Sequence, residues 1–308
     1  MPKPSIPGFV NEQARYVLSH QEAQLSSYWA SFFRNTTLNG VFGRGTGETA
    51  LETQDYQHFV QGLKQILRID LQYYKERQMK RRLQSLRDKL GYSTFCDFLE
   101  AIRQSPELQD IVLKRITINV TEFYRNPEQW QVLRTLILPQ LLKEKQNLQC
   151  WSSACSTGEE PYTLAMVLEE AGVRHYDILA TDIDPFVLEK AKQGVYGWVS
   201  VQNMPPNKLS TYFERQGDTV RFRKDRLRGQ VRFRKLDLLN DPFPKGFDLI
   251  LCRNVVIYFT DEAKHLLYQK LAESLVPNGY LFVGSTEQIF HAHQYRLYSV
   301  APFFYIKK

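Results

Sequence analysis

Cysteine is scarce in this sequence, with four cysteines among 308 residues, at positions 96, 150, 155 and 252. Scattered cysteines suit a reducing compartment better than a disulfide framework. Cys150 and Cys155 form the one close pair, and no second cysteine or histidine pair has the spacing of a zinc site. We therefore expect neither disulfides nor a bound metal.

Long apolar runs are also missing. The longest fall far short of the ~18–20 residues that span a bilayer, and the start at Met1–Pro4 has no signal-peptide core. We expect a cytoplasmic protein that does not insert into a membrane. With 308 residues, 43% of them hydrophobic, the chain is long enough for two domains with cores of their own.

The most informative segment, Trp151–Tyr162, has the pattern of a strand end, a tight turn and a helix start. It contains a single glycine, Gly158, followed by Glu159 and Glu160 where the helix dipole favours negative charge. A phosphate-binding loop has several glycines and leaves that end open for an anion. The pattern favours a cationic ligand without phosphate, such as S-adenosylmethionine. An ordinary capped strand–turn–helix corner is the alternative.

Three later segments place polar residues where apolar strands end. Asp182 closes the next strand, 24 positions after Gly158, near the ~20-residue offset at which a carboxylate meets a ribose hydroxyl. Asp237 follows in a short segment, and Arg253 and Asn254 end a strongly apolar strand. Because ligands bind at the carboxyl ends of strands in open α/β sheets, we expect these residues to share one site.

The domain organisation follows from the periodicities. Residues 1–50 are a poorly patterned extension, 51–129 a small all-α domain with its linker, and 130–308 a doubly wound, Rossmann-like α/β domain. A small β-hairpin subdomain is expected as an insertion at about 203–235. The helices of the all-α domain are predicted at 56–67, 71–90, 94–104 and 107–115.

The net charge of +7 indicates an anionic partner. Within the helix predicted at 71–90, apolar residues follow one stripe and basic residues cover the other faces. We interpret the basic residues as a docking surface, with a merely solvated helix face as the alternative. The residues proposed for docking are Lys75, Arg77, Lys80, Arg81 and Arg82.

A second basic region alternates arginine with apolar residues. Val220–Arg223 and Val231–Arg234 are predicted to be the two strands of the inserted hairpin. Arginines interleaved with Phe222 and Phe233 are typical of surfaces that bind single-stranded RNA. An antiparallel sheet with one wet face has the same pattern, and we favour that explanation.

Gly43–Gly47 spells G-x-G-x-G, but no convincing strand precedes it. We interpret it as a flexible connection and not as a cofactor loop.

Four blocks in order, and a closing fifth, resemble the chemotaxis receptor methyltransferases of the CheR type: Ile116–Asn126, Ser156–Tyr162, Ala180–Asp184, Cys252–Phe259 and Gly284–Glu287. The resemblance runs from about residue 55 to the C-terminus. It implies an S-adenosylmethionine-dependent enzyme of bacterial chemotaxis signalling. Such an enzyme methylates glutamate side chains on the cytoplasmic helices of chemoreceptors.

The resemblance also implies roles for individual residues. Arg125 and Tyr258 are the expected catalytic residues, and Arg125 is also expected to line the cofactor site. Asn119 and Thr121 should line the methionyl end, Glu160 should pair with the cofactor's ammonium group, and Asp182 with its ribose. The remaining cofactor contacts are expected from Gly158, Asp237, Leu238, Cys252, Arg253 and Asn254. We expect a monomer with acidic chemoreceptor helices as partner, and no nucleic acid.

Two other functions stay open at this point. An RNA methyltransferase would explain the charge, but no Asn-Pro-Pro-Tyr or catalytic cysteine motif follows the apolar strand. A non-catalytic receptor-binding module is disfavoured by the presence of both Arg125 and Tyr258. Some relatives hold the receptor's C-terminal tail on the inserted hairpin. The predicted hairpin is short and its turn Lys224–Gly229 is charged, and the preceding stretch Glu214–Asp218 has no glycine-rich loop that would let a peptide add as a strand. We therefore predict that this tether is absent here.

Overall fold

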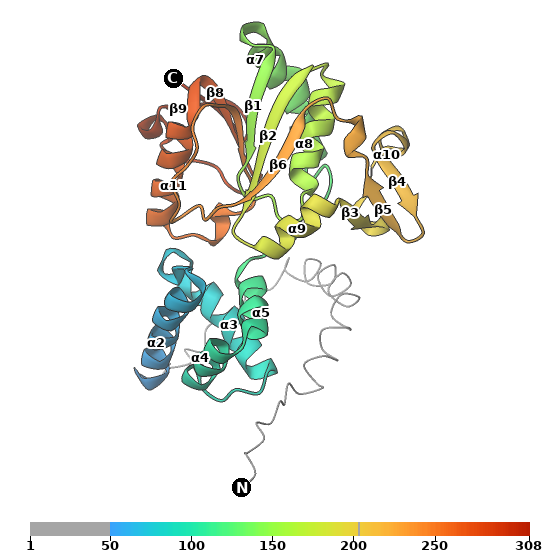
Figure 1. Cartoon of the computed structure of the whole chain (residues 1–308). Helices are drawn as coiled ribbons and strands as arrows, with labels where there is room; N and C mark the ends of the chain where they lie inside the picture. Colours follow the sequence, from blue (N-terminus) through green and yellow to red (C-terminus); the bar gives the residue numbers. More distant parts are fainter. Residues whose placement is uncertain (1–49, 203) are drawn as a thin grey trace, which may run out of the picture.

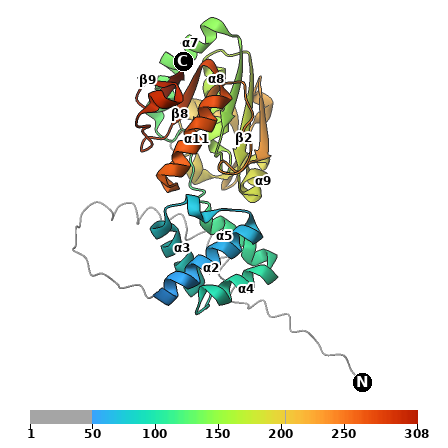
Figure 2. The same ribbon diagram turned by 90° about the vertical axis from the view of Figure 1, so that its left-hand side faces the viewer.

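The computed structural model describes residues 50–202 and 204–308 (Figure 1). The described chain forms a helical domain and a larger α/β domain, with the helical domain packed beneath one end of the sheet (Figure 1 and Figure 2). The Gly43–Gly47 motif lies outside the described residues. Within the described part of the chain, no helix combines the length and apolarity that crossing a bilayer requires.

The helical domain consists of α2 (Ala50–Leu67), α3 (Glu76–Lys89), α4 (Phe95–Gln104) and α5 (Pro106–Ile116). Side-chain caps define two of the starts, because Thr94 accepts a hydrogen bond from the N–H of Asp97 and Ser105 accepts one from Leu108. Their apolar faces meet in one core around Phe59. All four helices were predicted.

The helix predicted at 71–90 begins later than expected. Residues Leu71–Tyr73 form a short 3₁₀ turn, Tyr74 makes an isolated antiparallel bridge with Phe259, and α3 starts only at Glu76. The extended backbone at Tyr74 interrupts the helix because the residues on either side of it bond the α/β domain. Lys75 donates its N–H to the Tyr258 carbonyl at 2.9 Å, and the Tyr73 carbonyl accepts the N–H of Thr260 at 2.9 Å. This bridge ties the two domains together.

The α/β domain is built on a seven-stranded sheet of order β6-β2-β1-β7-β8-β10-β9. The first five strands in this order run parallel, and β10 is antiparallel to both of its neighbours. The strands are β1 (Asn147–Ser152), β2 (His175–Asp182), β6 (Gln230–Lys235), β7 (Phe247–Cys252), β8 (Leu275–Val283), β9 (Leu297–Ala301) and β10 (Phe304–Lys307).

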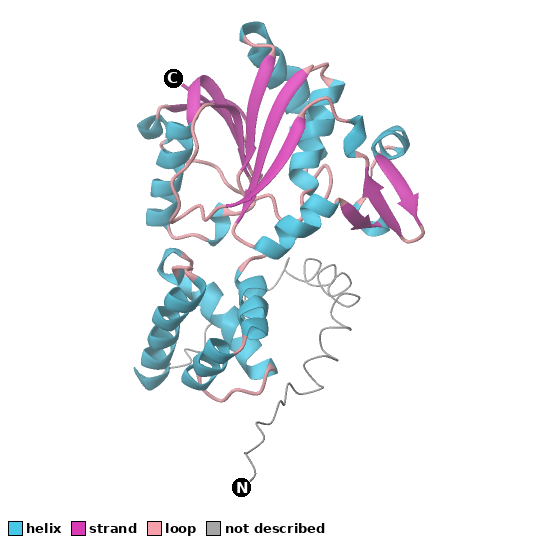
Figure 3. Ribbon diagram, in the orientation of Figure 1, coloured by secondary structure: helices cyan, strands magenta, loops and turns pink. Residues whose placement is uncertain are grey.

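Helices pack on both faces of this sheet (Figure 3). One face is covered by α6 (Pro127–Val132), α7 (Leu138–Glu144) and α8 (Glu159–Glu170). The other face packs against α11 (Asp261–Ser274). The helix α9 (Pro185–Gln193) contacts β2 and β6. The predicted doubly wound fold is confirmed.

The inserted subdomain is a three-stranded antiparallel sheet of order β3-β5-β4, with one helix beside it. Its elements are β3 (Val195–Gly197), α10 (Pro206–Tyr212), β4 (Phe213–Gln216) and β5 (Thr219–Phe222). In Figure 1 it projects from the side of the main sheet.

The pairing predicted inside this subdomain is wrong. Residues 220–223 do not pair with 231–234: β5 pairs with β3 and β4, whereas β6 runs parallel to β2 at the edge of the main sheet. The hairpin turn is at Gly217, with φ +62°. The alternation of apolar and basic residues did not distinguish the two arrangements. An edge strand whose Val231 and Phe233 pack on the core has the same two-residue period as a hairpin strand.

Candidate active site

A cavity opens at the carboxyl ends of β1, β2, β6 and β7, where the helical domain meets the sheet. Its space is about 960 Å³ when the part open to solvent is counted. Asp182, Asp237, Arg253 and Asn254 all line it, and Tyr74 lines it from the helical domain. The polar residues that follow the strand ends therefore lie around one cavity, as predicted.

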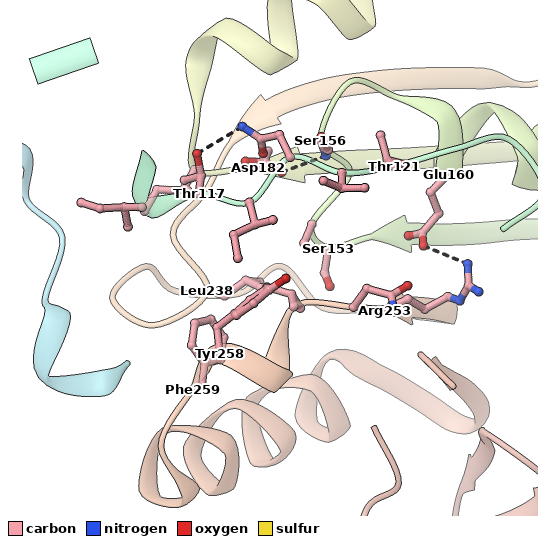
Figure 4. Close-up of a pocket in the computed structure, with 18 of the residues that line it drawn as sticks. Thr117, Thr121, Ser153, Ser156, Glu160, Asp182, Leu238, Arg253, Tyr258 and Phe259 are labelled. Carbon is pink, nitrogen blue, oxygen red and sulfur yellow. Dashed lines mark hydrogen bonds and ion pairs between the residues drawn. The ribbon is translucent and has the colours of Figure 1, made fainter. Parts of the chain in front are cut away.

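The turn after β1 brings the backbone close to Asp182. Ser156 has φ +47° and donates its N–H to Asp182 Oδ2 at 2.8 Å (Figure 4). The Ser156 hydroxyl is buried on the cavity wall without a hydrogen-bond partner among the described residues. Gly158, at φ +96°, does not line the cavity: a Cβ there would lie 2.8 Å from that of Ala191 on α9. Glycine at this position lets the turn pack closely against α9.

Two carboxylates form the acidic side of the cavity. Burial raises the pKa of Asp182 to about 6, and its oxygens accept the N–H groups of Ser156 and Asp184. Burial also raises the pKa of Glu160, and the adjacent Arg253 opposes that shift. Glu160 accepts the Ser152 hydroxyl at 2.8 Å. Two carboxylates and an unpartnered hydroxyl fit the ammonium group and ribose of S-adenosylmethionine.

The linker between the domains forms another wall. Asn119 and Thr121 line the cavity, and the Asn119 amide donates to Asp184 Oδ2 at 3.1 Å. Thr117 donates to the same oxygen at 3.4 Å, while the other oxygen of Asp184 caps α9. Asp184 therefore fixes the linker to the sheet, a role that the sequence analysis did not assign.

Arg125 lies on a strained turn. Tyr124 and Asn126 have φ values of +56° and +59°, a conformation that costs about 1–2 kcal/mol for a residue with a Cβ. Tyr124 donates its N–H to Thr163 Oγ1 at 3.1 Å, and the Trp130 indole donates to the Arg125 carbonyl at 3.0 Å. These bonds hold the turn so that the half-buried Arg125 lines the cavity, where its Nη1 donates to the Val120 carbonyl at 3.1 Å.

Tyr258 projects into the same cavity (Figure 4). Burial raises the pKa of Tyr258, so its hydroxyl is protonated at neutral pH. Its backbone carbonyl accepts the N–H of Lys75 at 2.9 Å, and the Arg82 guanidinium lies 5.6 Å from its ring centroid. The helical domain therefore supports this residue from behind.

Glu287 organises the loop that carries Asn254 and Tyr258. Its buried carboxylate accepts three backbone N–H groups, from Asn254 at 2.5 Å, Val256 at 2.9 Å and Gly284 at 2.9 Å. A Cβ on Gly284 would come within 2.4 Å of that carboxylate, so glycine is required for the approach. Both residues belong to a segment that resembles the CheR type, but no pattern in the sequence indicated their role.

The remaining predicted cofactor residues divide into two groups. Asp237, Leu238 and Asn254 line the cavity, although the Asp237 carboxylate is engaged by the Leu239 N–H at 2.8 Å and by the Asn240 amide at 2.7 Å. Cys252 is fully buried and does not line the cavity. A contact between Cys252 and adenine would need its backbone, as the sequence analysis allowed.

The predicted docking residues do not share one environment. Lys75, Arg77 and Arg81 are exposed. Lys80 is half-buried, with its amino group 5.1 Å from the ring centroid of Tyr56. Arg82 is also half-buried and donates to the Ile116 carbonyl at 3.2 Å. Arg82 thus belongs to the packing behind Tyr258, and the exposed three remain for docking.

Comparison with known families agrees with this architecture. The model of the CheR methyltransferase S-adenosylmethionine-binding domain matches residues 119–303, and that of the CheR all-alpha domain matches residues 54–117. The chain belongs to the CheR methyltransferase family. It is accordingly an S-adenosylmethionine-dependent methyltransferase, as the resemblance implied.

The regions that match individual relatives cover most of the length of each relative. A chemotaxis protein methyltransferase of Listeria monocytogenes is 46% identical over 82% of this chain and 97% of its own. Chemotaxis protein methyltransferase 1 of Pseudomonas aeruginosa is 33% identical over 76% and 90%. That of Borreliella burgdorferi is 34% identical over 72% and 83%. All three similarities extend across both domains of this methyltransferase.

Proposed function

We propose that this methyltransferase transfers the methyl group of S-adenosylmethionine to glutamate side chains on the cytoplasmic helices of chemoreceptors. The observation that carries the proposal is the pairing of two walls in one cavity. Asp182 and Glu160 form an acidic wall for a cationic cofactor, and Arg125 and Tyr258 form a wall that attracts an anion. The names of the relatives, which refer to chemotaxis, support the choice of receptor.

The chemistry requires no general base. A glutamate side chain has a pKa of about 4.3, so it is already an ionised nucleophile at neutral pH. Among the described residues that line the cavity there is no histidine, lysine or cysteine, which suits such a substrate. S-adenosylmethionine supplies the electrophilic methyl group when it is bound.

The residues of this chain then act by binding and orientation. Arg125 presents a planar guanidinium that matches a carboxylate. The protonated hydroxyl of Tyr258 donates to the substrate carboxylate or lies against the sulfonium. Holding two reactants in line supplies ~7–11 kcal/mol in favourable cases. Asn119 and Thr121 are proposed to line the methionyl end, and Asp237, Leu238 and Asn254 the adenine.

Labelling distinguishes this proposal from its rivals. The protein is incubated with methyl-labelled S-adenosylmethionine and either receptor-rich membranes or total RNA. We expect label on the receptor that alkali releases as methanol, the signature of a carboxyl ester. The matched control is a receptor whose methylated glutamates are replaced by alanine. Label on RNA would support a nucleic-acid methyltransferase, and cofactor binding without any transfer would support a binding module.

Cofactor affinity should depend on pH through Asp182. Because burial raises the pKa of Asp182 to about 6, the ionised carboxylate that accepts the ribose hydroxyls is lost as pH falls through that value. Affinity for S-adenosylhomocysteine, measured by calorimetry, should then drop by up to about tenfold per pH unit below it.

Asp182→Asn is the matched control for this dependence. The variant should bind weakly at neutral pH with a flatter profile. A residual slope is expected from Glu160, whose pKa burial also raises. A wild-type affinity that stays constant from pH 7 to about pH 5 would contradict the raised pKa of Asp182, because an aspartate with the usual pKa of about 3.9 stays ionised over that range. Binding by Asp182→Asn as tight as by the wild type at neutral pH would contradict the ribose role. If neither S-adenosylmethionine nor S-adenosylhomocysteine binds at millimolar concentration, the whole proposed cofactor site is wrong.

A further inference from the structure

Arg253 directly follows β7, and the bonds of its guanidinium run to Glu160 and to the turn of Arg125, not to the residues assigned to adenine. Its side chain is 1% exposed and lies between two aromatic rings, 5.2 Å from the centroid of Trp130 and 4.6 Å from that of Phe282. Figure 4 shows it pointing toward Glu160. A buried cation is tolerated only when it is paired and hydrogen-bonded, so its partners indicate its task.

One nitrogen of Arg253 bonds the turn that carries Arg125. Nη2 donates to the Arg125 carbonyl at 2.9 Å, to Asn126 Oδ1 at 3.2 Å and to Gln129 Oε1 at 3.2 Å. Tyr124 and Asn126, on either side of Arg125, have positive φ values that persist only where the surroundings hold them. Arg253 is part of those surroundings.

The other terminal nitrogen of Arg253, Nη1, faces the cofactor side, whereas Nε is buried without a hydrogen-bond partner among the described residues. Nη1 lies 3.4 Å from Glu160 Oε2, and Glu160 is the acid proposed to bind the cofactor's ammonium group. A single buried guanidinium therefore joins the acid of the cofactor wall to the turn of the substrate wall. Arginine suits this position better than lysine, because its rigid fork bonds partners in two directions at once.

We propose that Arg253 is a positioning residue that holds the Arg125 turn in place and links it to Glu160, instead of contacting adenine through its side chain. The proposal rests on the proposed role of Arg125 in glutamate methylation. If it is right, loss of Arg253 acts on transfer through Arg125 and acts only weakly on cofactor affinity.

The main test is a double-mutant cycle with Arg253→Met and Arg125→Ala. Arg253→Met should lower receptor kcat by about 100-fold, the effect of a small misplacement of a reacting group. It should weaken S-adenosylhomocysteine binding by less than the tenfold that 1.4 kcal/mol represents, a loss expected because Glu160 is left without its cationic partner. In the Arg125→Ala background it should cost nothing further, because residues that act as a unit are not additive. Arg253→Lys should recover part of the loss.

A milder variant keeps the test valid if Arg253→Met fails to fold. Asn126→Gly with Gln129→Met removes two acceptors of the turn while keeping Arg253 and Glu160, and glycine tolerates the positive φ. It should lower kcat in the same direction without weakening S-adenosylhomocysteine binding. Amide hydrogen exchange should rise at residues 124–129 in both variants, and this readout needs no receptor substrate.

The outcomes separate the two proposals. If the wild-type protein fails to methylate receptors while amide hydrogen exchange at 124–129 rises in the variants, the proposed function is wrong. The positioning role of Arg253 is then still supported. If Arg253→Met weakens cofactor binding as much as transfer, or if its effect adds fully to that of Arg125→Ala, Arg253 contacts the cofactor. Unchanged exchange at 124–129 would also overturn the proposal.

Discussion

Replacing Arg125 by alanine should lower receptor methylation by about 1000-fold in kcat/KM, as removal of a preorganised charge-stabilising group does. The guanidinium lines the cavity close to Tyr258, and its one hydrogen bond among the described residues is to the Val120 carbonyl. It is therefore available to a substrate carboxylate. Calorimetry should find a much smaller loss of S-adenosylhomocysteine affinity, because the amino-acid carboxylate is the one anionic group of that ligand with which a guanidinium can pair.

Two further variants make this prediction specific. Arg125→Lys should restore only part of the activity, since a point charge lacks the planar fork that matches a carboxylate. Arg134→Ala removes an exposed arginine from the following helical segment and should have no effect, because Arg134 does not line the cavity. Loss of cofactor affinity equal to the loss of transfer would show that Arg125 serves the cofactor.

Structural features that depend on short, continuous segments were predictable from the sequence. The strand, turn and helix around Gly158 follow from local preferences, and so does the acid at the end of β2. A parallel sheet then brings Asp182 and Asn254 to one edge without knowledge of their contacts. The four helices of the small domain were predictable for the same reason, apart from the start of α3.

Features that depend on distant pairing were not predictable. The alternation of Val231 and Phe233 fits a hairpin strand and an edge strand equally well, and the parallel partner β2 decides between them. Arg253 bonds Arg125 across 128 positions, and Glu287 bonds Asn254 across 33. No local pattern indicates that an arginine at a strand end turns away from the ligand.

Receptor docking should depend on the exposed cations of α3. The triple variant Lys75→Glu, Arg77→Glu, Arg81→Glu should raise the receptor KM by about 30-fold at low ionic strength, which corresponds to about 0.7 kcal/mol for each of the three exposed residues. Lys75 hydrogen-bonds through its backbone to Tyr258, so α3 begins beside the proposed methylation site. Substitution of its side chain keeps that bond.

Salt and a matched variant separate docking from net charge. The wild-type KM should rise with salt, because the Debye length is ~8 Å at physiological ionic strength, and the triple variant should respond less. Reversal of Arg134, Lys143 and Lys308 gives the same net charge, and these exposed residues do not line the cavity. That control should keep the wild-type KM, and both variants should bind S-adenosylhomocysteine normally.

The competing explanation is a tether on the inserted subdomain. Within the described residues, β4 pairs only with β5, so its outer edge offers backbone groups to a peptide strand. We nevertheless predict α3 as the main contact, since its three exposed cations match an acidic receptor bundle and the helix begins beside Tyr258. Deleting the receptor's C-terminal tail should leave the KM unchanged. If that deletion strongly lowers receptor methylation while the α3 charge reversal does not, the receptor is held by β4 and the docking prediction is wrong.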